Sequence, residues 1–203
     1  MRVFAGKTEL EDAWKQCARH WLERLLKRLG GDYRIARSEN FLFLSEHSDA
    51  AAAKSLAFLE QARSHIHKVL GEISPADAQG EHVVLRFTAE DDYYLYISHF
   101  DMDGAFAGSG GMFLDGGYQH IAYPQSRDAA EERRTLVHEL AHGLLAHLPL
   151  PPWINEALAM AFERDLAGST CEPLSRDLAA RHRAYWGCSD DPAILARAFV
   201  FRR

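Results

Sequence analysis

LVHELAHGLLAHLPLPPWINEALAMAFE, residues 136–163, is the most informative run of the chain. It contains a His-Glu-x-x-His pattern, in which His138 and His142 lie four positions apart and Glu139 follows the first histidine. In a helix, residues four apart project from the same face, so both imidazoles can reach a single ion. Asp128 is a suitable N-cap for this helix, which we expect to extend to about His147, before proline-rich residues 148–152.

A second helix is predicted directly after the prolines, from Trp153 to Leu166, with Gly168 as its end signal. Glu156 lies on this helix, and the short turn before it allows the two helices to pack as neighbours. Both helices carry apolar residues at helical spacing for that contact: Val137, Leu140, Ala141, Leu144 and Leu145 on the first, and Ile154, Leu158, Ala161 and Phe162 on the second.

These residues are suited to a catalytic zinc site, which needs three protein ligands and one position left open for water. The candidate metal ligands are His138, His142 and Glu156, for one Zn²⁺ per chain, and Glu139 is the candidate general base. The five-residue motif alone is short enough to arise by chance in a chain with 11 histidines, and the position of Glu156 strengthens it. The alternative is an amphipathic helix that binds no metal.

The rest of the chain is predicted to alternate helices with short strands. In chain order, we expect a helix capped by Thr8 and Glu11 and ended by Gly30; a hairpin of 33–36 and 41–45; a helix over 48–70 carried on Leu56, Leu59, Ile66, Val69 and Leu70; an interior strand at 82–87; an ambiguous segment at 91–100, for which we favour helix; a hairpin of 112–114 and 118–123 around Asp115 to Gly117; and a last helix at 174–186.

This order of elements predicts an α+β fold, with a small mixed or antiparallel sheet packed on the motif helix. A glycine-rich hairpin supplies an edge strand, and the glutamate-bearing helix and a short helical C-terminal part follow. We expect a single domain over 1–203, divided into an α+β lobe at 1–127 and a helical part at 128–203 with the metal site. No linker or internal repeat suggests a domain boundary.

The run from Leu136 to Glu163 resembles the active-site helices of the gluzincins, the peptidase MA-like zinc metallopeptidases. In that group a Trp-x-x-Glu-Gly-x-Ala stretch carries the glutamate ligand, and this chain has Ala157 in place of the commoner glycine. The resemblance implies a zincin-like fold, and the order of elements before the motif is also similar. It further implies that the strand from Gly111 to Leu114 pairs with an extended peptide substrate.

The resemblance also implies a reaction. Zn²⁺ held by the three ligands would activate a water molecule, Glu139 would accept its proton, and the resulting hydroxide would attack a peptide carbonyl. In related enzymes a Tyr or His from a later helix stabilises the oxyanion, which leaves Tyr185 and His182 as the two candidates.

The resemblance leaves the orientation of the histidines open. Thermolysin-like gluzincins have an Asp four positions after the glutamate ligand, where this chain has Met160. Glu163 lies on the same helical face and is a candidate substitute that would orient a histidine. An exposed glutamate beside Arg164 is the simpler interpretation, and we favour it.

The other polar residues that stand out have simpler structural explanations. We expect His147 to complement the dipole at its helix end, His120 to be an ordinary strand residue, and His65 and His67 to be solvated. Trp14 and Trp21 share a helical face and are expected to pack either in the core or between helices. Cys17, Cys171 and Cys188 include no Cys-x-x-Cys pair and are expected to be structural.

Composition limits the classes of function. The 203 residues carry a net charge of −6, with a pI near 6.0, which makes a nucleic-acid partner improbable. No signal-peptide-like start and no run of 18 apolar residues is present, so we expect a cytoplasmic protein without a membrane span. The leading hypothesis is a zinc metallopeptidase that acts on a peptide or protein. Alternatives are a catalytically inactive zinc-binding protein that binds a partner, and a hydrolase of another amide or ester.

Overall fold

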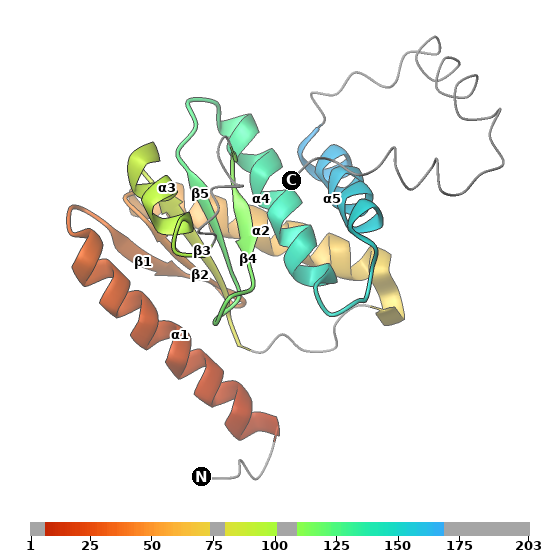
Figure 1. Ribbon diagram of the computed structural model, residues 1–203, viewed down its shortest axis with the longest axis horizontal. Helices are drawn as coiled ribbons and strands as arrows, with labels where there is room; N and C mark the ends of the chain where they lie inside the picture. Colours follow the sequence, from red (N-terminus) through yellow and green to blue (C-terminus); the bar gives the residue numbers. More distant parts are fainter. Residues whose placement is uncertain (1–6, 74–79, 101–108, 169–203) are drawn as a thin grey trace, which may run out of the picture.

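The computed structural model describes residues 7–73, 80–100 and 109–168, and these form a mixed sheet covered by helices on both faces (Figure 1). Its elements in chain order are α1 (Lys7–Leu29), β1 (Arg34–Arg37), β2 (Phe41–Ser45), α2 (Asp49–Leu70), a 3₁₀ turn (Gly71–Ile73), β3 (His82–Phe87), α3 (Glu90–Ile97), β4 (Met112–Leu114), β5 (His120–Pro124), α4 (Ala129–Leu145) and α5 (Pro152–Ala167). The predicted α+β class is confirmed.

The five strands lie in the order β1-β2-β3-β5-β4. β1 pairs antiparallel with β2, the central strands β2, β3 and β5 are parallel, and β4 pairs antiparallel with β5. Both predicted hairpins are therefore present, and β3 is the interior strand. β4 lies at the edge of the sheet, as predicted, and this edge is the one beside α4.

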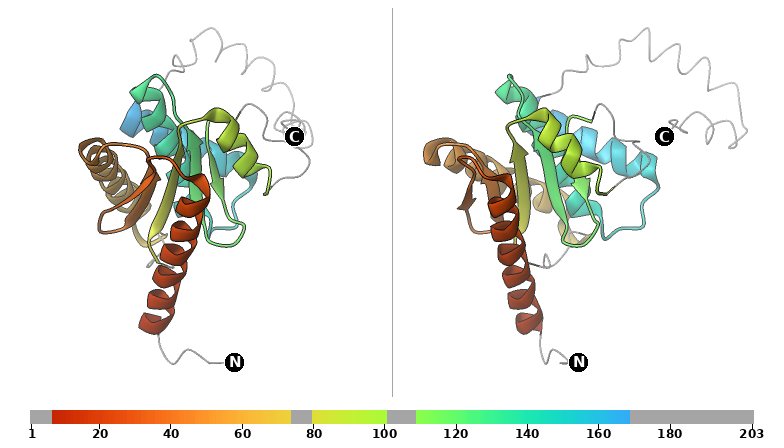
Figure 2. Two further views of the ribbon diagram at one scale, coloured as in Figure 1. Left: turned by 90° about the vertical axis from the view of Figure 1, so that its left-hand side faces the viewer. Right: turned by 60° about the vertical axis from the view of Figure 1, so that its left-hand side comes forward.

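Two apolar clusters fill the space on either side of the sheet. Alternate residues along each strand point to opposite faces, so Val84 packs toward α2 and α4, whereas Val83 and Leu85 pack toward α1 and α3. The two further views show the same three layers, with α5 outside α4 (Figure 2). The α4–α5 contact is the one that the apolar patterns predicted, with Leu140, Ala141 and Phe162 buried.

Several element boundaries and apolar faces differ from the predictions. Helix α1 begins at Lys7, so Thr8 is within its first turn instead of capping it, and Leu10 on its predicted apolar face is 40% exposed. Val69 is 60% exposed, because the buried face of α2 is completed by alanines 52 and 62. Helix α4 ends at Leu145, two residues earlier than predicted.

Buried polar contacts fix α4 against the sheet. Arg86 of β3 donates to Glu132 of α4 at 2.9 Å, and both side chains are mostly buried. Glu132 also accepts from the backbone N–H of Ser126, three residues before α4 begins. These contacts hold the first turns of α4 in place, and the candidate site lies on its next two turns. No helix among the described residues is long and apolar enough to cross a membrane.

Candidate metal centre

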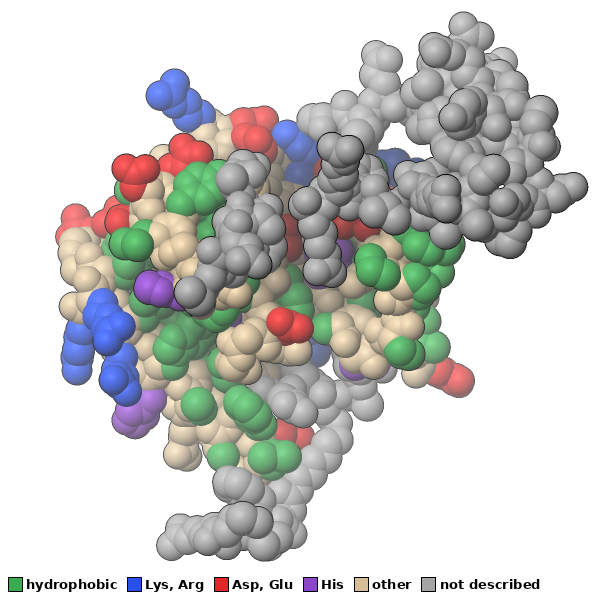
Figure 3. Space-filling model, in the orientation of Figure 1, with side chains coloured by type: hydrophobic (Ala, Val, Ile, Leu, Met, Phe, Trp, Pro, Cys, Tyr) green, Lys and Arg blue, Asp and Glu red, His purple; other side chains and the backbone are tan. Residues whose placement is uncertain are grey.

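Helices α4 and α5 bring the three predicted ligands together. Nε2 of His138 lies 3.1 Å from Nε2 of His142, and each nitrogen lies near a different oxygen of Glu156, at 3.3 and 3.5 Å. Among the described residues, this is the one group of three or more His, Cys, Asp or Glu side chains whose ligand atoms converge in this way. In the space-filling view, acidic and histidine side chains lie beside each other between these two helices (Figure 3).

The opposite nitrogen of each imidazole contacts an oxygen atom. Nδ1 of His138 lies 3.2 Å from Oε2 of Glu163, and Nδ1 of His142 lies 3.1 Å from Oδ1 of Asn155. The interpretation of Glu163 as an exposed glutamate was therefore wrong, since its side chain is only 23% exposed and faces α4. Residues 156 and 163 are two helical turns apart, so both project from α5 toward the histidines. Asn155 was not predicted, and its position beside Glu156 was the one available signal.

These atoms lie close enough together to converge on one metal ion. Zinc ligands about 2.0–2.1 Å from the metal at tetrahedral angles lie about 3.3–3.4 Å from one another. The two Nε2 atoms lie 3.1 Å apart, and one ligand atom from each of the three residues lies within 4.8 Å of the others. Because each Nδ1 faces an oxygen acceptor, the neutral imidazoles carry their proton there, and each Nε2 presents a lone pair. Two lone pairs and a carboxylate then meet at one point, which is an arrangement that a cation would stabilise.

The charges of the cluster perturb its ionisation. Burial alone would lower the pKa of His138, but the hydrogen bond with Glu156 and the negative charge of Glu139 outweigh it and raise the pKa to about 9. The pKa of His142 is raised by the same opposition, with Asn155 adding a hydrogen bond. Hydrogen bonds with the two histidines hold the pKa of Glu156 well below its usual range. The cluster therefore attracts positive charge, whether a proton or a metal ion supplies it.

Glu139 lies on the sheet side of the group. Its Oε2 accepts a hydrogen bond of 2.7 Å from the backbone N–H of Phe113 on edge strand β4. Burial raises the pKa of Glu139 and outweighs the opposing effects of the two histidines and of this hydrogen bond. Among the described residues no hydrogen-bond donor is assigned to its other oxygen, Oε1, so that atom can accept a proton.

The edge strand lies against α4 because two glycines allow close approach. A Cβ atom at Gly111 would collide with Thr135, and one at Gly143 would lie 3.0 Å from the Phe113 ring. The outward backbone groups of this strand are partly occupied: Phe113 N–H by Glu139, and Gly111 N–H and C=O by the hydroxyl of Ser109. A peptide that paired with this edge would have to displace the Ser109 contacts. Substrate pairing along Gly111–Leu114 therefore stays a prediction.

Cavities open on both sides of Glu139. The larger, of about 500 Å³, extends past Phe113 and Asp115 toward Asn155 and Leu148. The smaller, of about 350 Å³, extends past Gly111 toward Arg134 and Glu163. His138 and Glu139 line both, so the two cavities adjoin the candidate centre.

The other histidines of the described chain do not join this centre. His120, buried in β5, contacts the Tyr118 carbonyl and the Tyr96 hydroxyl, as expected of a structural strand residue. His147 lies beyond the end of α4 and contacts the Ile73 carbonyl, so it links two segments, which the helix-dipole interpretation did not include. His65 is exposed, as predicted, whereas His67 is partly buried, which differs from the prediction.

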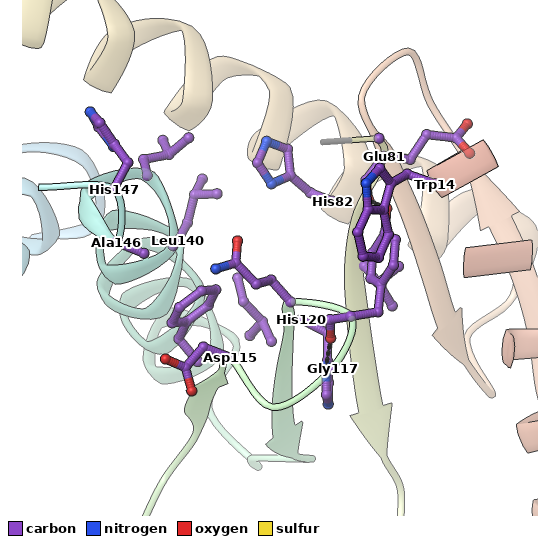
Figure 4. A pocket seen from close by; sticks show the side chains of 17 residues that line it. Trp14, Glu81, His82, Asp115, Gly117, His120, Leu140, Ala146 and His147 are labelled. Atoms are coloured by element: carbon purple, nitrogen blue, oxygen red, sulfur yellow. Dashed lines mark hydrogen bonds between the residues drawn. The ribbon is translucent and has the colours of Figure 1, made fainter. Parts of the chain in front are cut away.

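A further cavity, of about 320 Å³, lies between the start of β3, the β4–β5 turn and the end of α4 (Figure 4). Its histidines, 82, 120 and 147, come from different walls and do not point toward a common centre. Trp14 lines this cavity, and Trp14 and Trp21 pack against Tyr118, which confirms their predicted packing role. Cys17 is an exposed free thiol.

The oxyanion candidates Tyr185 and His182 lie outside the described residues, as do the predicted helix at 174–186 and Cys171 and Cys188. No protein-family model matches the chain, and no curated protein matches it. The comparisons therefore assign it to no family, and the resemblance to the gluzincins stays a prediction.

Proposed function

We propose that this protein is a zinc-dependent peptidase with a zincin-like fold, in which His138, His142 and Glu156 bind one Zn²⁺. The observation that carries the proposal is the convergence of two imidazole Nε2 atoms and a carboxylate, with each imidazole contacted on its Nδ1 side by Glu163 or Asn155. Chance placement of a short motif on a helix does not explain partners on a second helix. When bound, zinc would activate a water molecule and polarise the substrate carbonyl.

Glu139 is suited to the proton transfers of such a reaction. Phe113 N–H fixes Oε2, which leaves Oε1 to accept a proton and later return it to the leaving amine. Its raised pKa strengthens it as a base. The adjacent edge strand offers Phe113 C=O to an extended substrate, and the two cavities accommodate residues on either side of the cleaved bond.

The first experiment measures zinc content by elemental analysis, in protein purified without added metal and again after reconstitution. About one zinc per chain is expected in the native protein and in Glu139→Gln, and strongly reduced zinc in Glu156→Ala. A peptide-library cleavage assay then compares native protein with Glu139→Gln, for which a loss of about 10²–10⁴-fold in rate is expected. Absence of zinc from the reconstituted native protein would sink the proposal.

Zinc binding without catalysis is the second candidate function. The observation that favours it is the occupation of the outward groups of β4 by Ser109 and Glu139, which leaves little free edge for a substrate. This candidate predicts one zinc per chain, no cleavage of any library peptide, and no difference between native protein and Glu139→Gln.

A further inference from the structure

The smaller cavity beside the candidate centre contains one arginine, Arg134, and no lysine among the described residues that line it. Arg134 lies one helical turn before His138 and therefore projects from the same face of α4. Its side chain is only 17% exposed. The side chain as a whole is thus mostly removed from water, and it lines the same cavity as His138 and Glu139.

Among the described residues, few hydrogen-bond acceptors are assigned to Arg134. Within the described part of the chain, the assigned partner of the guanidinium is Asp128, whose carboxylate lies 3.6 Å away and is itself 60% exposed. The other Asp128 oxygen already caps the helix by accepting from Ala130 N–H. A guanidinium has five N–H donors in a planar fork that matches a carboxylate, so a long contact with one exposed oxygen leaves most of them available.

The neighbouring carboxylates do not take up this capacity. Glu163 contacts His138, Glu139 accepts from Phe113, and Glu131 accepts from the Ser126 hydroxyl. Each of these acidic groups therefore has a partner other than Arg134.

The direction of a bound peptide decides which of its residues meets Arg134. β4 runs alongside α4 in the same direction, since Gly111 lies by Thr135 and Phe113 by Gly143. Antiparallel pairing is the more stable arrangement of strands, and a peptide antiparallel to β4 runs from Phe113 toward Gly111. Its residues on the C-terminal side of the cleaved bond then enter the smaller cavity.

We propose that Arg134 selects substrates that present a carboxylate within one or two residues on the C-terminal side of the cleaved bond. This inference rests on the proposed peptidase function. The carboxylate comes either from an Asp or Glu side chain or from the free C-terminus of a short peptide, since both offer the same two oxygens. A charge-assisted contact of this kind changes binding about tenfold to a hundredfold.

The test uses the full chain reconstituted with zinc. Cleavage of a mixed peptide library locates the cleaved bond, and amidated peptides with Glu, Gln or Lys after that bond are then compared by kcat/KM. Native protein is expected to prefer Glu over Gln at least tenfold. Arg134→Gln should reduce this ratio to within about twofold, and Arg134→Glu should favour Lys. Arg133→Gln is the matched control, because Arg133 is on the same helix but packs over Phe58.

Peptides with a free and an amidated C-terminus distinguish the two sources of the carboxylate. A preference for the free C-terminus that disappears in Arg134→Gln assigns the contact to the terminus, and a preference for Glu assigns it to the side chain. Two results would overturn the inference. One is a preference of the native protein for Lys, and the other is a ratio of kcat/KM between Glu and Gln peptides that Arg134→Gln leaves unchanged.

Binding separates failure of this inference from failure of the proposed function. The dissociation constants of the same peptides are measured by fluorescence anisotropy on Glu139→Gln, with and without Arg134→Gln. If native protein cleaves no peptide, the peptidase proposal fails. The dissociation constants alone then test whether Arg134 selects peptides that carry a carboxylate. Equal affinity for the Glu and Gln peptides refutes that selection.

Discussion

Removing the carboxylate behind His138 should weaken metal binding without removing any ligand. Glu163 contacts Nδ1 of His138 at 3.2 Å, and its side chain is 23% exposed. In Glu163→Ala the imidazole loses the acceptor that keeps its proton on Nδ1, so the tautomer that presents a lone pair at Nε2 is no longer favoured. Loss of such a partner lowers metal affinity about tenfold to a hundredfold, equivalent to about 1.4–2.8 kcal/mol.

The structure also ranks the variants. The Glu163 contact involves a charged acceptor, whereas Asn155 contacts His142 through a neutral amide at 3.1 Å. Hydrogen bonds with an ionised partner are roughly twice as strong as neutral ones. We therefore expect zinc affinity to fall in the order native protein, Asn155→Ala, Glu163→Ala. Glu163→Gln, which keeps an acceptor oxygen but loses the charge, should lie close to Asn155→Ala.

The assay is competition for zinc against a chromophoric chelator of known affinity, at constant pH and ionic strength. Asp165→Asn is the control, because it removes the same charge two residues away on the exposed side of α5. Thermal unfolding of the metal-free proteins shows whether each variant folds. The reasoning is refuted if folded Glu163→Ala binds zinc within twofold of the native protein, or if Asp165→Asn loses as much affinity as Glu163→Ala.

Three further predictions concern the framework of the site. Gly111→Ala should cost about 1–3 kcal/mol of unfolding free energy because its Cβ collides with Thr135, and Thr135→Ala should restore part of that loss, as measured by urea denaturation. Burial lowers the pKa of His120 to about 4, so the folded state binds fewer protons than the unfolded chain below about pH 6.5. The stability that His120 contributes is therefore complete above pH 6.5 and is lost as the pH falls toward 4. Between these pH values, the free energy of unfolding of the native protein should fall with decreasing pH. In His120→Gln this slope should be smaller by up to about 1.4 kcal/mol per pH unit. Arg86→Met should lower the free energy of unfolding by about 3–5 kcal/mol, because the mostly buried Glu132 loses its cationic partner. Arg86→Met combined with Glu132→Leu should recover much of that stability in the same denaturation assay. Equal stability of the single and double variants would contradict this.

The predictions from sequence were most accurate where the signal was local. The N-cap Asp128, the hydrophobic periodicity and Gly168 placed α4 and α5 to within a few residues, because caps and periodicity act over one or two turns. The predictions were least accurate about which side chains are buried. Leu10 and Val69 were placed on buried faces and are exposed, since burial depends on which distant element covers a helical face.

The sequence by itself determined which residues could act as ligands, because a spacing of four within one helix places His138 and His142 on one face in any fold. It also determined that Glu156 belongs to the next helix. Only the tertiary structure decided that Glu163 and Asn155 contact the histidines, that Glu139 accepts from the edge strand, and that Arg134 lines a cavity beside them. Those contacts depend on how α5 and β4 pack against α4. That packing is set by buried contacts between the sheet and the helices on its α4 side. The residues that make these contacts are far apart in the chain, so no short stretch of sequence contains them.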